Sequence, residues 1–131
     1  MDKVKLLIQS WRALSHSYAV VNQFQCLQLL QKQQLQLFFE DLPLLGGWQS
    51  DQTLFDTNSM RELNAIAPLA DQKPDIVYRM AYPFDFSLSY PCRHYVFVTT
   101  EYGCLRPETC VQSIAEIKLI MQKHDVQIIT P

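Results

Sequence analysis

Polar and ionisable side chains gather in three clusters, each placed directly after a predicted β-strand. The first cluster follows a strand expected at residues 4–8 and extends into the helix after it. Its members are Arg12, His16, Ser17, Tyr18, Asn22 and Gln23. The amino end of a helix offers free amides and a positive dipole to an anion, and a histidine or arginine beside it can pair with phosphate or carboxylate. The cluster therefore predicts recognition of an anionic ligand.

Two observations narrow the chemistry of this first cluster. Residues 9–23 contain no glycine, so a glycine-rich cradle for a pyrophosphate is not expected. For His16 the alternative is a surface loop histidine without a function, although histidine is the side chain that titrates near neutral pH. For Asn22 and Gln23 the alternative is a solvated helix face, which the composition favours for Gln23.

The second cluster lies near and after the end of a strand expected at residues 75–82. Its members are Arg79, Tyr82 and Asp85. Arg79 stands in an otherwise apolar strand, and a buried guanidinium must be paired because its burial is otherwise very costly. A ligand contact is one interpretation of Arg79. The pattern favours the other, an arginine that faces outward from an edge strand.

The third cluster, Thr99, Thr100, Glu101 and Tyr102, ends a strand expected at residues 94–100. Glu101 can act as a general base or accept hydrogen bonds from sugar hydroxyls, provided that the strand order places it beside the first strand. The alternative is an ordinary acid at a strand end. The sequence holds no Ser/His/Asp or Cys/His order, no HExxH or P-loop motif and no metal-ligand spacing, so neither a metal nor a cofactor is expected.

Short apolar runs alternate with helical patterns along the chain, which is typical of parallel βαβ construction. Strands are expected at residues 4–8, 35–39, 75–82, 94–100 and 126–130. The expected fold is an α/β, Rossmann-like, doubly wound parallel sheet of about five strands. In such sheets ligands bind outside the carboxyl ends of the strands, where the three clusters fall.

Three helices connect the strands in this prediction. The first covers about residues 18–32, with Ser17 as its N-cap and an apolar stripe of Val20, Phe24 and Leu27, widened by Val21 and Leu30. The second is capped by Thr57 or Asn58 and ends near Ala65. The third begins with Pro107 in its first turn and carries an apolar stripe of Cys110, Ile114, Ile117 and Met121.

Composition limits the classes of partner and the location of the chain. The 131 residues are 48% hydrophobic and 18% charged with a net charge of -2, which excludes a disordered chain and disfavours a nucleic-acid binder. No apolar stretch approaches the roughly 20 residues of a membrane span, and the amino terminus does not resemble a signal peptide. Four cysteines without a CxxC pair indicate free thiols in a reducing compartment, so we expect a cytoplasmic protein.

The chain stops one residue after its last predicted strand. Because the helix after such a strand normally covers the outer face of the sheet, we expect residues 1–131 to be one truncated domain with an uncovered sheet face. Association through that face is a further expectation.

Several ordered motifs resemble the amino-terminal half of bacterial, especially cyanobacterial, glycosyltransferases of the group 1 type. These motifs are Trp11-Arg12, His16 to Ala19, Asn22 to Gln25, Asp41-Leu42-Pro43, Asp75 to Arg79, Tyr82 to Asp85 and Thr100-Glu101. The resemblance implies one half of a GT-B architecture, in which two Rossmann-type domains face each other across a cleft. It implies that the amino-terminal domain holds the acceptor and that a second domain, absent from this sequence, binds the nucleotide-sugar.

The resemblance also implies roles for individual residues. His16 to Tyr18 and Asn22 would line the cleft, and Glu101 would face it. With the residue analysis, this predicts Glu101 and His16 as catalytic. The predicted substrate-binding residues are Arg12, Ser17, Tyr18, Asn22, Arg79 and Thr100.

The function expected from these observations is transfer of a sugar from a nucleotide-sugar donor to a hydroxyl acceptor, completed only by the second domain. This chain alone is expected to be inactive. The alternatives are a standalone flavodoxin-like binding or interaction module without catalysis, because fold alone does not settle function, and a decayed gene product.

Overall fold

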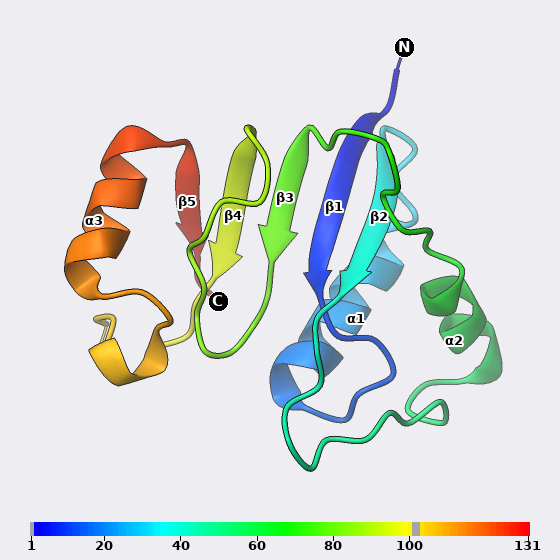
Figure 1. Cartoon of the computed structure of the whole chain (residues 1–131). Helices are drawn as coiled ribbons and strands as arrows, with labels where there is room; N and C mark the ends of the chain where they lie inside the picture. The colour runs from blue at the N-terminus through cyan, green and yellow to red at the C-terminus, as the bar shows by residue number, and fades with distance from the viewer. Residues whose placement is uncertain (1, 101–102) are drawn as a thin grey trace.

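The computed structural model describes residues 2–100 and 103–131 as a five-stranded sheet with helices on both faces. The strands are β1 (Val4–Ser10), β2 (Leu35–Asp41), β3 (Ile76–Arg79), β4 (Arg93–Phe97) and β5 (Val126–Ile129). All four strand pairings are parallel, in the order β2-β1-β3-β4-β5 (Figure 1). The predicted α/β doubly wound fold is therefore confirmed, and this strand order is the flavodoxin-like one.

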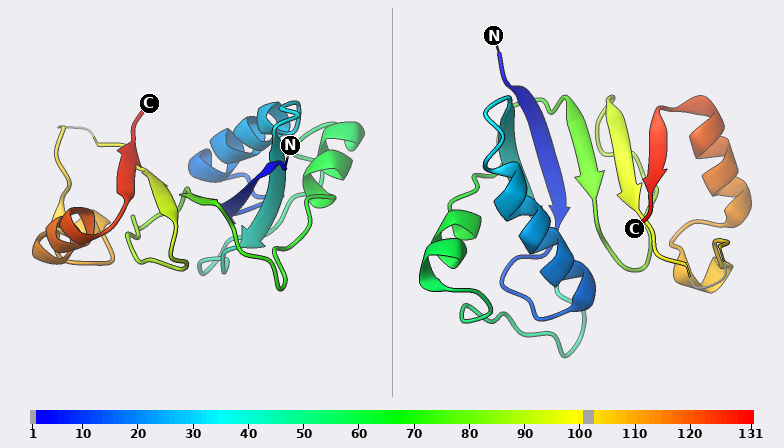
Figure 2. Two further views of the ribbon diagram at one scale, coloured as in Figure 1. Left: turned by 90° about the horizontal axis from the view of Figure 1, so that it is seen from above. Right: turned by 180° about the vertical axis from the view of Figure 1, so that it is seen from behind.

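The helices are α1 (Ser17–Leu29), α2 (Thr57–Asn64) and α3 (Ile114–Lys123), with a short 3-10 helix at Pro107–Thr109. Figure 2 shows α1 and α3 on opposite sides of the sheet. We call these sides the α1 face and the α3 face. The connection from β3 to β4, residues 80–92, contains no helix, and we call it the β3–β4 loop.

Alternation along the strands supplies a core to each face. Leu6 and Ile8 of β1 face α1 and share a cluster with Met60 and Leu63 of α2. On the α3 face, Val96 packs with Ile117 of α3. Since successive strand residues point to opposite faces, one sheet with apolar residues at nearly every position serves two helical layers.

Two helix starts differ from the sequence prediction. Asp56, not Thr57 or Asn58, caps α2 by accepting a hydrogen bond from the Ser59 amide. His16 occupies the N-cap position of α1 without a side-chain cap, so the prediction of Ser17 as N-cap is wrong.

The helix expected from Pro107 is two elements. Pro107 opens the 3-10 helix, whereas α3 begins at Ile114 behind a reciprocal capping box of Ser113 and Glu116. The Ser-x-x-Glu pattern predicts this start, because each side chain satisfies an amide at the helix amino end.

The first helix is rotated relative to the predicted apolar stripe. Its buried residues are Ala19, Asn22, Gln23 and Cys26, whereas Phe24 is 56% exposed. Small side chains at two of the buried positions let the helix approach the sheet closely, and Gln23 is needed there for hydrogen bonds described below. The expectation of a solvated face for Gln23 is therefore wrong.

Cys26, Cys92, Cys104 and Cys110 are all free thiols. Within the described residues, no helix has the length and apolar character needed to cross a membrane.

Candidate functional site

A pocket of about 270 Å³ opens at the carboxyl end of the sheet, beside the amino end of α1. We call it the carboxyl-edge pocket. Its lining residues are Tyr18, Tyr82, Phe84, Thr99, Thr100, Cys104, Arg106 and Thr109. They come from α1, from the β3–β4 loop and from the segment after β4. After β1 the chain connects to β2 on one side of the sheet, and after β3 it connects to β4 on the other side. Open α/β sheets bind ligands where neighbouring connections diverge in this way.

Two tyrosines form the aromatic part of the pocket. The rings of Tyr18 and Tyr82 are nearly parallel, with an interplanar angle of 10° and centroids 6.0 Å apart. Phe84 meets both rings edge-on, at centroid distances of 6.2 and 5.7 Å. The hydroxyl of Tyr18 hydrogen-bonds with the hydroxyl of Thr99. The pocket thus combines flat aromatic surface with hydroxyl groups at its edge.

The far wall of the pocket is held to the β3–β4 loop by backbone pairing. Phe84 donates its amide to the carbonyl of Thr109 and accepts from the amide of Val111, at 2.9 Å each. Arg106 is the only charged residue among the described lining residues, and it forms an exposed ion pair with Glu108. Because both side chains are more than half exposed, an anionic ligand can compete for Arg106 at little cost.

Arg79 positions the β3–β4 loop. It is 3% exposed, on a central strand, so the interpretation as an outward-facing edge arginine is wrong. Its Nη1 donates to the carbonyls of Asp85 and Ser87 at 2.7 Å each, and its Nη2 donates to Ser89 Oγ at 2.9 Å. Its Nε donates to Gln9 Oε1 at 2.8 Å. These contacts satisfy a buried guanidinium internally, and substrate binding by Arg79 stays a prediction.

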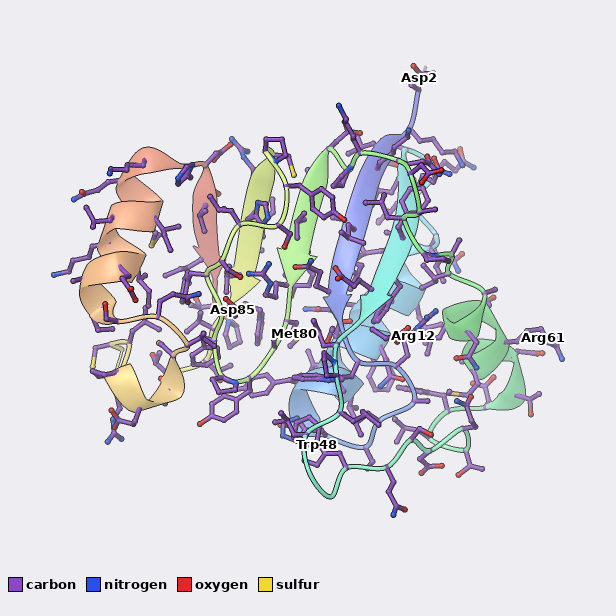
Figure 3. All side chains as sticks on the ribbon, in the orientation of Figure 1. Asp2, Arg12, Trp48, Arg61, Met80 and Asp85 are labelled. Carbon is purple, nitrogen blue, oxygen red and sulfur yellow. The ribbon has the colours of Figure 1, made fainter. Side chains whose placement is uncertain are left out.

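Asp85 lies beside Arg79. Figure 3 shows Asp85, Met80 and Arg12 near the carboxyl ends of the strands. Partial burial acts to raise the pKa of Asp85, but hydrogen bonds from Gln112 and Ser87 and the charge of Arg79 outweigh it and lower the pKa. The carboxylate is therefore an ionised structural acceptor at neutral pH.

His94 holds the same loop from β4. Its ring is buried, its Nδ1 lies 2.8 Å from the carbonyl of Cys92, and its Nε2 accepts the Ser89 amide at 3.2 Å. Burial lowers the pKa of His94, and the charge of Arg79 lowers it further against the opposing hydrogen bond to Cys92.

The structure places the predicted residue Arg12 away from the pocket. It donates to both carboxylate oxygens of Asp41, at 3.0 and 2.5 Å. Its Nη1 donates to the carbonyls of Leu63 and Ile66, at 3.0 Å each, and the guanidinium lies 4.6 Å from the Phe39 ring centroid. Arg12 therefore joins the loop after β1 to β2 and to the carboxyl end of α2.

His16 lies next to the pocket within an aromatic group. Its ring centroid is 4.4 Å from that of Trp48 and 5.7 Å from that of Tyr18. Its Nδ1 is the one buried side-chain nitrogen or oxygen without a hydrogen-bond partner in the described part of the chain. Such an unpaired atom is unfavourable by about 1–3 kcal/mol, so it marks either a functional group or a tolerated packing fault.

Asn22 and Gln23 are fully buried under α1. Gln23 Oε1 accepts the Ala13 amide at 2.8 Å, while its Nε2 donates to the carbonyls of Leu14 and Ala19 at 3.3 and 2.9 Å. Asn22 contacts only residues of its own helix through its amide group. A solvated helix face is therefore wrong for both residues, and the structure does not bring Asn22 to the pocket.

The remaining predicted residues have different placements. Tyr18 and Thr100 both line the pocket, whereas Ser17 is exposed at the start of α1. Substrate binding by these three residues stays a prediction. Glu101, predicted as catalytic, lies outside the described residues.

Sequence reasoning assigned a site role to two of the eight lining residues, Tyr18 and Thr100. Tyr82 and Thr99 belonged to the predicted clusters without an assigned role, while Phe84, Cys104, Arg106 and Thr109 were not predicted at all. The first two were detectable because they directly follow strands. The other four lie at the pocket because the β3–β4 loop pairs with residues 109–111. No local sequence pattern predicts this pairing.

No protein family model, curated protein or solved structure matches the chain. A function must therefore be inferred from the geometry of the site.

Proposed function

We propose that the carboxyl-edge pocket binds the hydroxylated ring of a sugar acceptor, and that the chain is the acceptor-side domain of a glycosyltransferase. The observation that carries this proposal is the stacked pair of Tyr18 and Tyr82 beside the hydroxyls of Thr99 and Thr100. A sugar ring presents C–H groups on its faces and hydroxyls at its edge. Aromatic faces suit the first, and tyrosine and threonine hydroxyls can donate to or accept from the second.

The size and charge of the pocket also support a small polar ligand. About 270 Å³ is near the lower end of the volumes of ligand pockets, which suits one or two sugar rings and not a dinucleotide. Arg106 at the rim could pair with a carboxylate or phosphate on such an acceptor.

Transfer would require a nucleotide-sugar donor held by a second domain, as in the glycosyltransferases that the sequence resembles. In this proposal Glu101 is the general base, and His16, whose ring centroid lies 5.7 Å from that of Tyr18, assists beside the acceptor. The free thiols support a cytoplasmic location as part of the same proposal.

Calorimetric titration with free mono- and disaccharides, including a uronic acid, tests this proposal. Binding of one of them should weaken about fivefold in Tyr18→Phe, because one hydroxyl partner is removed. The matched control is Tyr95→Phe, which removes a tyrosine hydroxyl outside the lining of the carboxyl-edge pocket. Equal affinities of the two variants, or no binding by the parent chain, would reject the acceptor site.

A groove on the α1 face favours a second candidate function, self-association without catalysis. The groove has a volume of about 650 Å³. It is lined by Leu6, Val21, Phe24, Gln25, Gln28, Leu29, Ile76, Tyr78, Tyr95 and Ile129. None of these described residues is an acid or a base, so two copies of this net-negative chain could meet there without like-charge repulsion.

Sedimentation velocity distinguishes this candidate. A second copy on the groove predicts a dimer that Val21→Glu dissociates, because two carboxylates would be buried near the two-fold axis. The control Val111→Glu changes another exposed valine, which lies outside the groove. A monomer at all concentrations would exclude this function and leave the sugar-binding proposal unaffected.

A further inference from the structure

We propose that His94 is an acid-sensitive latch on the β3–β4 loop, and that its protonation releases the Ser89 segment of this loop. The loop also carries Tyr82 and Phe84 of the carboxyl-edge pocket. The latch is a property of the chain itself. It can therefore be tested without any ligand, and it stands or falls separately from the sugar-binding proposal.

The hydrogen bonds of His94 fix its protonation state. The carbonyl of Cys92 can only accept, so Nδ1, 2.8 Å away, must carry a proton. The backbone amide of Ser89 can only donate, so Nε2 must present its lone pair at 3.2 Å. Both contacts are satisfied by one neutral tautomer and by no other form of the ring.

Protonation removes one of these two contacts. A second proton on Nε2 turns the acceptor into a donor that points at the N–H of Ser89. Ser89 also accepts a hydrogen bond at its Oγ from Arg79 Nη2, 2.9 Å away. A histidinium would therefore add a second positive charge close to the buried Arg79, and the Ser89 amide would lose its hydrogen bond to the ring.

The surrounding groups do not compensate this charge. On the loop, Asp85 is engaged by Gln112 and Ser87, and Cys92 offers its carbonyl to Nδ1. From the strand side, Glu40 of β2 accepts from Gln9 at 2.6 Å, and Asp125 before β5 pairs with the exposed Arg93. The core on the α3 face receives the aliphatic Ile114, Ile117 and Ile120 from α3. The charge of Arg79 acts on the imidazole and opposes its protonation.

Acid should therefore release the β3–β4 loop progressively, starting from its end nearest β4. The Ser89 to Cys92 end is released first, because His94 contacts it directly. The Asp85 and Ser87 carbonyls follow because they depend on the same guanidinium, at 2.7 Å each. Tyr82 and Phe84 lie upstream on this loop, so opening the latch would disturb the aromatic wall of the pocket.

The test is a pH titration of the isotope-labelled chain by NMR, which follows the His94 ring nitrogens and the hydrogen exchange of the Ser89 amide. At neutral pH, Nδ1 should show the shift of a protonated nitrogen and Nε2 that of an unprotonated one. Between about pH 7.5 and about pH 5, the protection of the Ser89 amide should fall at least about tenfold after correction for intrinsic exchange, in step with the His94 titration.

Two variants separate the latch from a general acid effect. His94→Gln replaces the ring with an amide that does not titrate, so protection of Ser89 should lose its pH dependence. His124→Gln, at the exposed carboxyl end of α3, should retain it. If His94→Gln does not fold, the parent chain still decides. A His94 ring that titrates without a change at Ser89, or one that is protonated at both nitrogens at neutral pH, would overturn the latch.

Discussion

Gln9 of β1 and Arg79 of β3 are register partners in the parallel sheet, and Arg79 Nε donates to Gln9 Oε1 at 2.8 Å. Gln9 is also the register partner of Glu40 on β2, to which its Nε2 donates at 2.6 Å. A polar row therefore crosses three neighbouring strands near their carboxyl ends. It connects an acid at the rim of the sheet to a buried guanidinium, which in turn positions the β3–β4 loop and one wall of the pocket.

Arg79→Lys should destabilise the chain although the charge is retained. A lysine cannot reproduce four directed hydrogen bonds to groups on β1 and on the loop, so the partly buried carbonyls of Asp85 and Ser87 would lose their donors. The expected loss in free energy of unfolding is about 2–4 kcal/mol. Urea unfolding followed by tryptophan fluorescence measures it.

The control for this change is Arg93→Lys, at an exposed pair with Asp125. It should leave the urea midpoint unchanged, because the pair is solvated. Equal midpoints for the parent chain and Arg79→Lys would mean that the buried network contributes no stability.

Gln23→Leu should destabilise the chain strongly although leucine and glutamine have similar volumes. The change leaves the buried amide of Ala13 and the carbonyl of Leu14 without partners, at an expected loss of about 2–4 kcal/mol. Gln28→Leu, on the exposed side of the same helix, should change the free energy of unfolding by less than about 0.5 kcal/mol. Similar losses in the two variants would contradict the role of Gln23 in holding the loop after β1.

The sequence predicts the sheet well and the helix faces less well. Strands such as residues 35–39 are detectable because runs of apolar and aromatic residues fit a sheet that is covered on both faces. The face of α1 is not detectable in this way, since its buried side is set by the hydrogen bonds that Gln23 makes to Ala13 and Leu14. A helical wheel counts hydrophobicity and not the needs of a neighbouring loop.

The same limit applies to the predicted site. Tyr18 and Thr100 both line the pocket, and both were detectable because they follow the carboxyl ends of strands, where ligands bind in open α/β sheets. Arg12 fits the same rule, yet its guanidinium is occupied by the carbonyls of Leu63 and Ile66. Those partners are more than 50 residues away in the sequence, so no local pattern could reveal that they compete with a ligand.

His16→Phe distinguishes a functional histidine from a packed one. Phenylalanine keeps an aromatic ring against Trp48 and removes the buried Nδ1 that lacks a partner. The thermal midpoint should stay equal or rise, because removing an unsatisfied buried atom relieves an unfavourable contact of about 1 kcal/mol. A strong loss of stability would show that Nδ1 has a partner in solution.

Stability should fall as the pH decreases from neutrality, and His94 should cause part of this change. Its pKa is lowered in the folded chain, mainly by burial, so below the ordinary histidine value of about 6.5 the unfolded chain binds the proton more readily. The free energy of unfolding therefore declines between about pH 7 and about pH 5.

Urea unfolding at a series of pH values measures this decline, with His94→Gln and His124→Gln compared with the parent chain. The lowered pKa of Asp85 acts separately, since its contribution is present above an ordinary aspartate value of about 3.9 and is lost in stronger acid. A parent chain as stable at about pH 5 as at neutrality would contradict the account of His94.

The cysteines should differ sharply in reactivity. Cys26 is fully buried and its pKa is raised to about 12, mainly by burial, so iodoacetamide should modify it only after unfolding. Cys104 is exposed and lines the pocket, so it should react in the folded chain. A bound saccharide should slow the alkylation of Cys104, as measured by mass spectrometry. Unchanged alkylation at a saturating concentration would place the ligand elsewhere.

The most direct test of the central proposal is an NMR titration of the isotope-labelled chain with the saccharide that binds most tightly in calorimetry. The largest chemical-shift changes should occur at Tyr18, Tyr82 and Thr99 and should follow one saturation curve. Tyr95, in the groove on the α1 face, should change little. Shift changes confined to the groove, or none at all at about ten times the dissociation constant found by calorimetry, would contradict a sugar-binding site at the carboxyl end of the sheet.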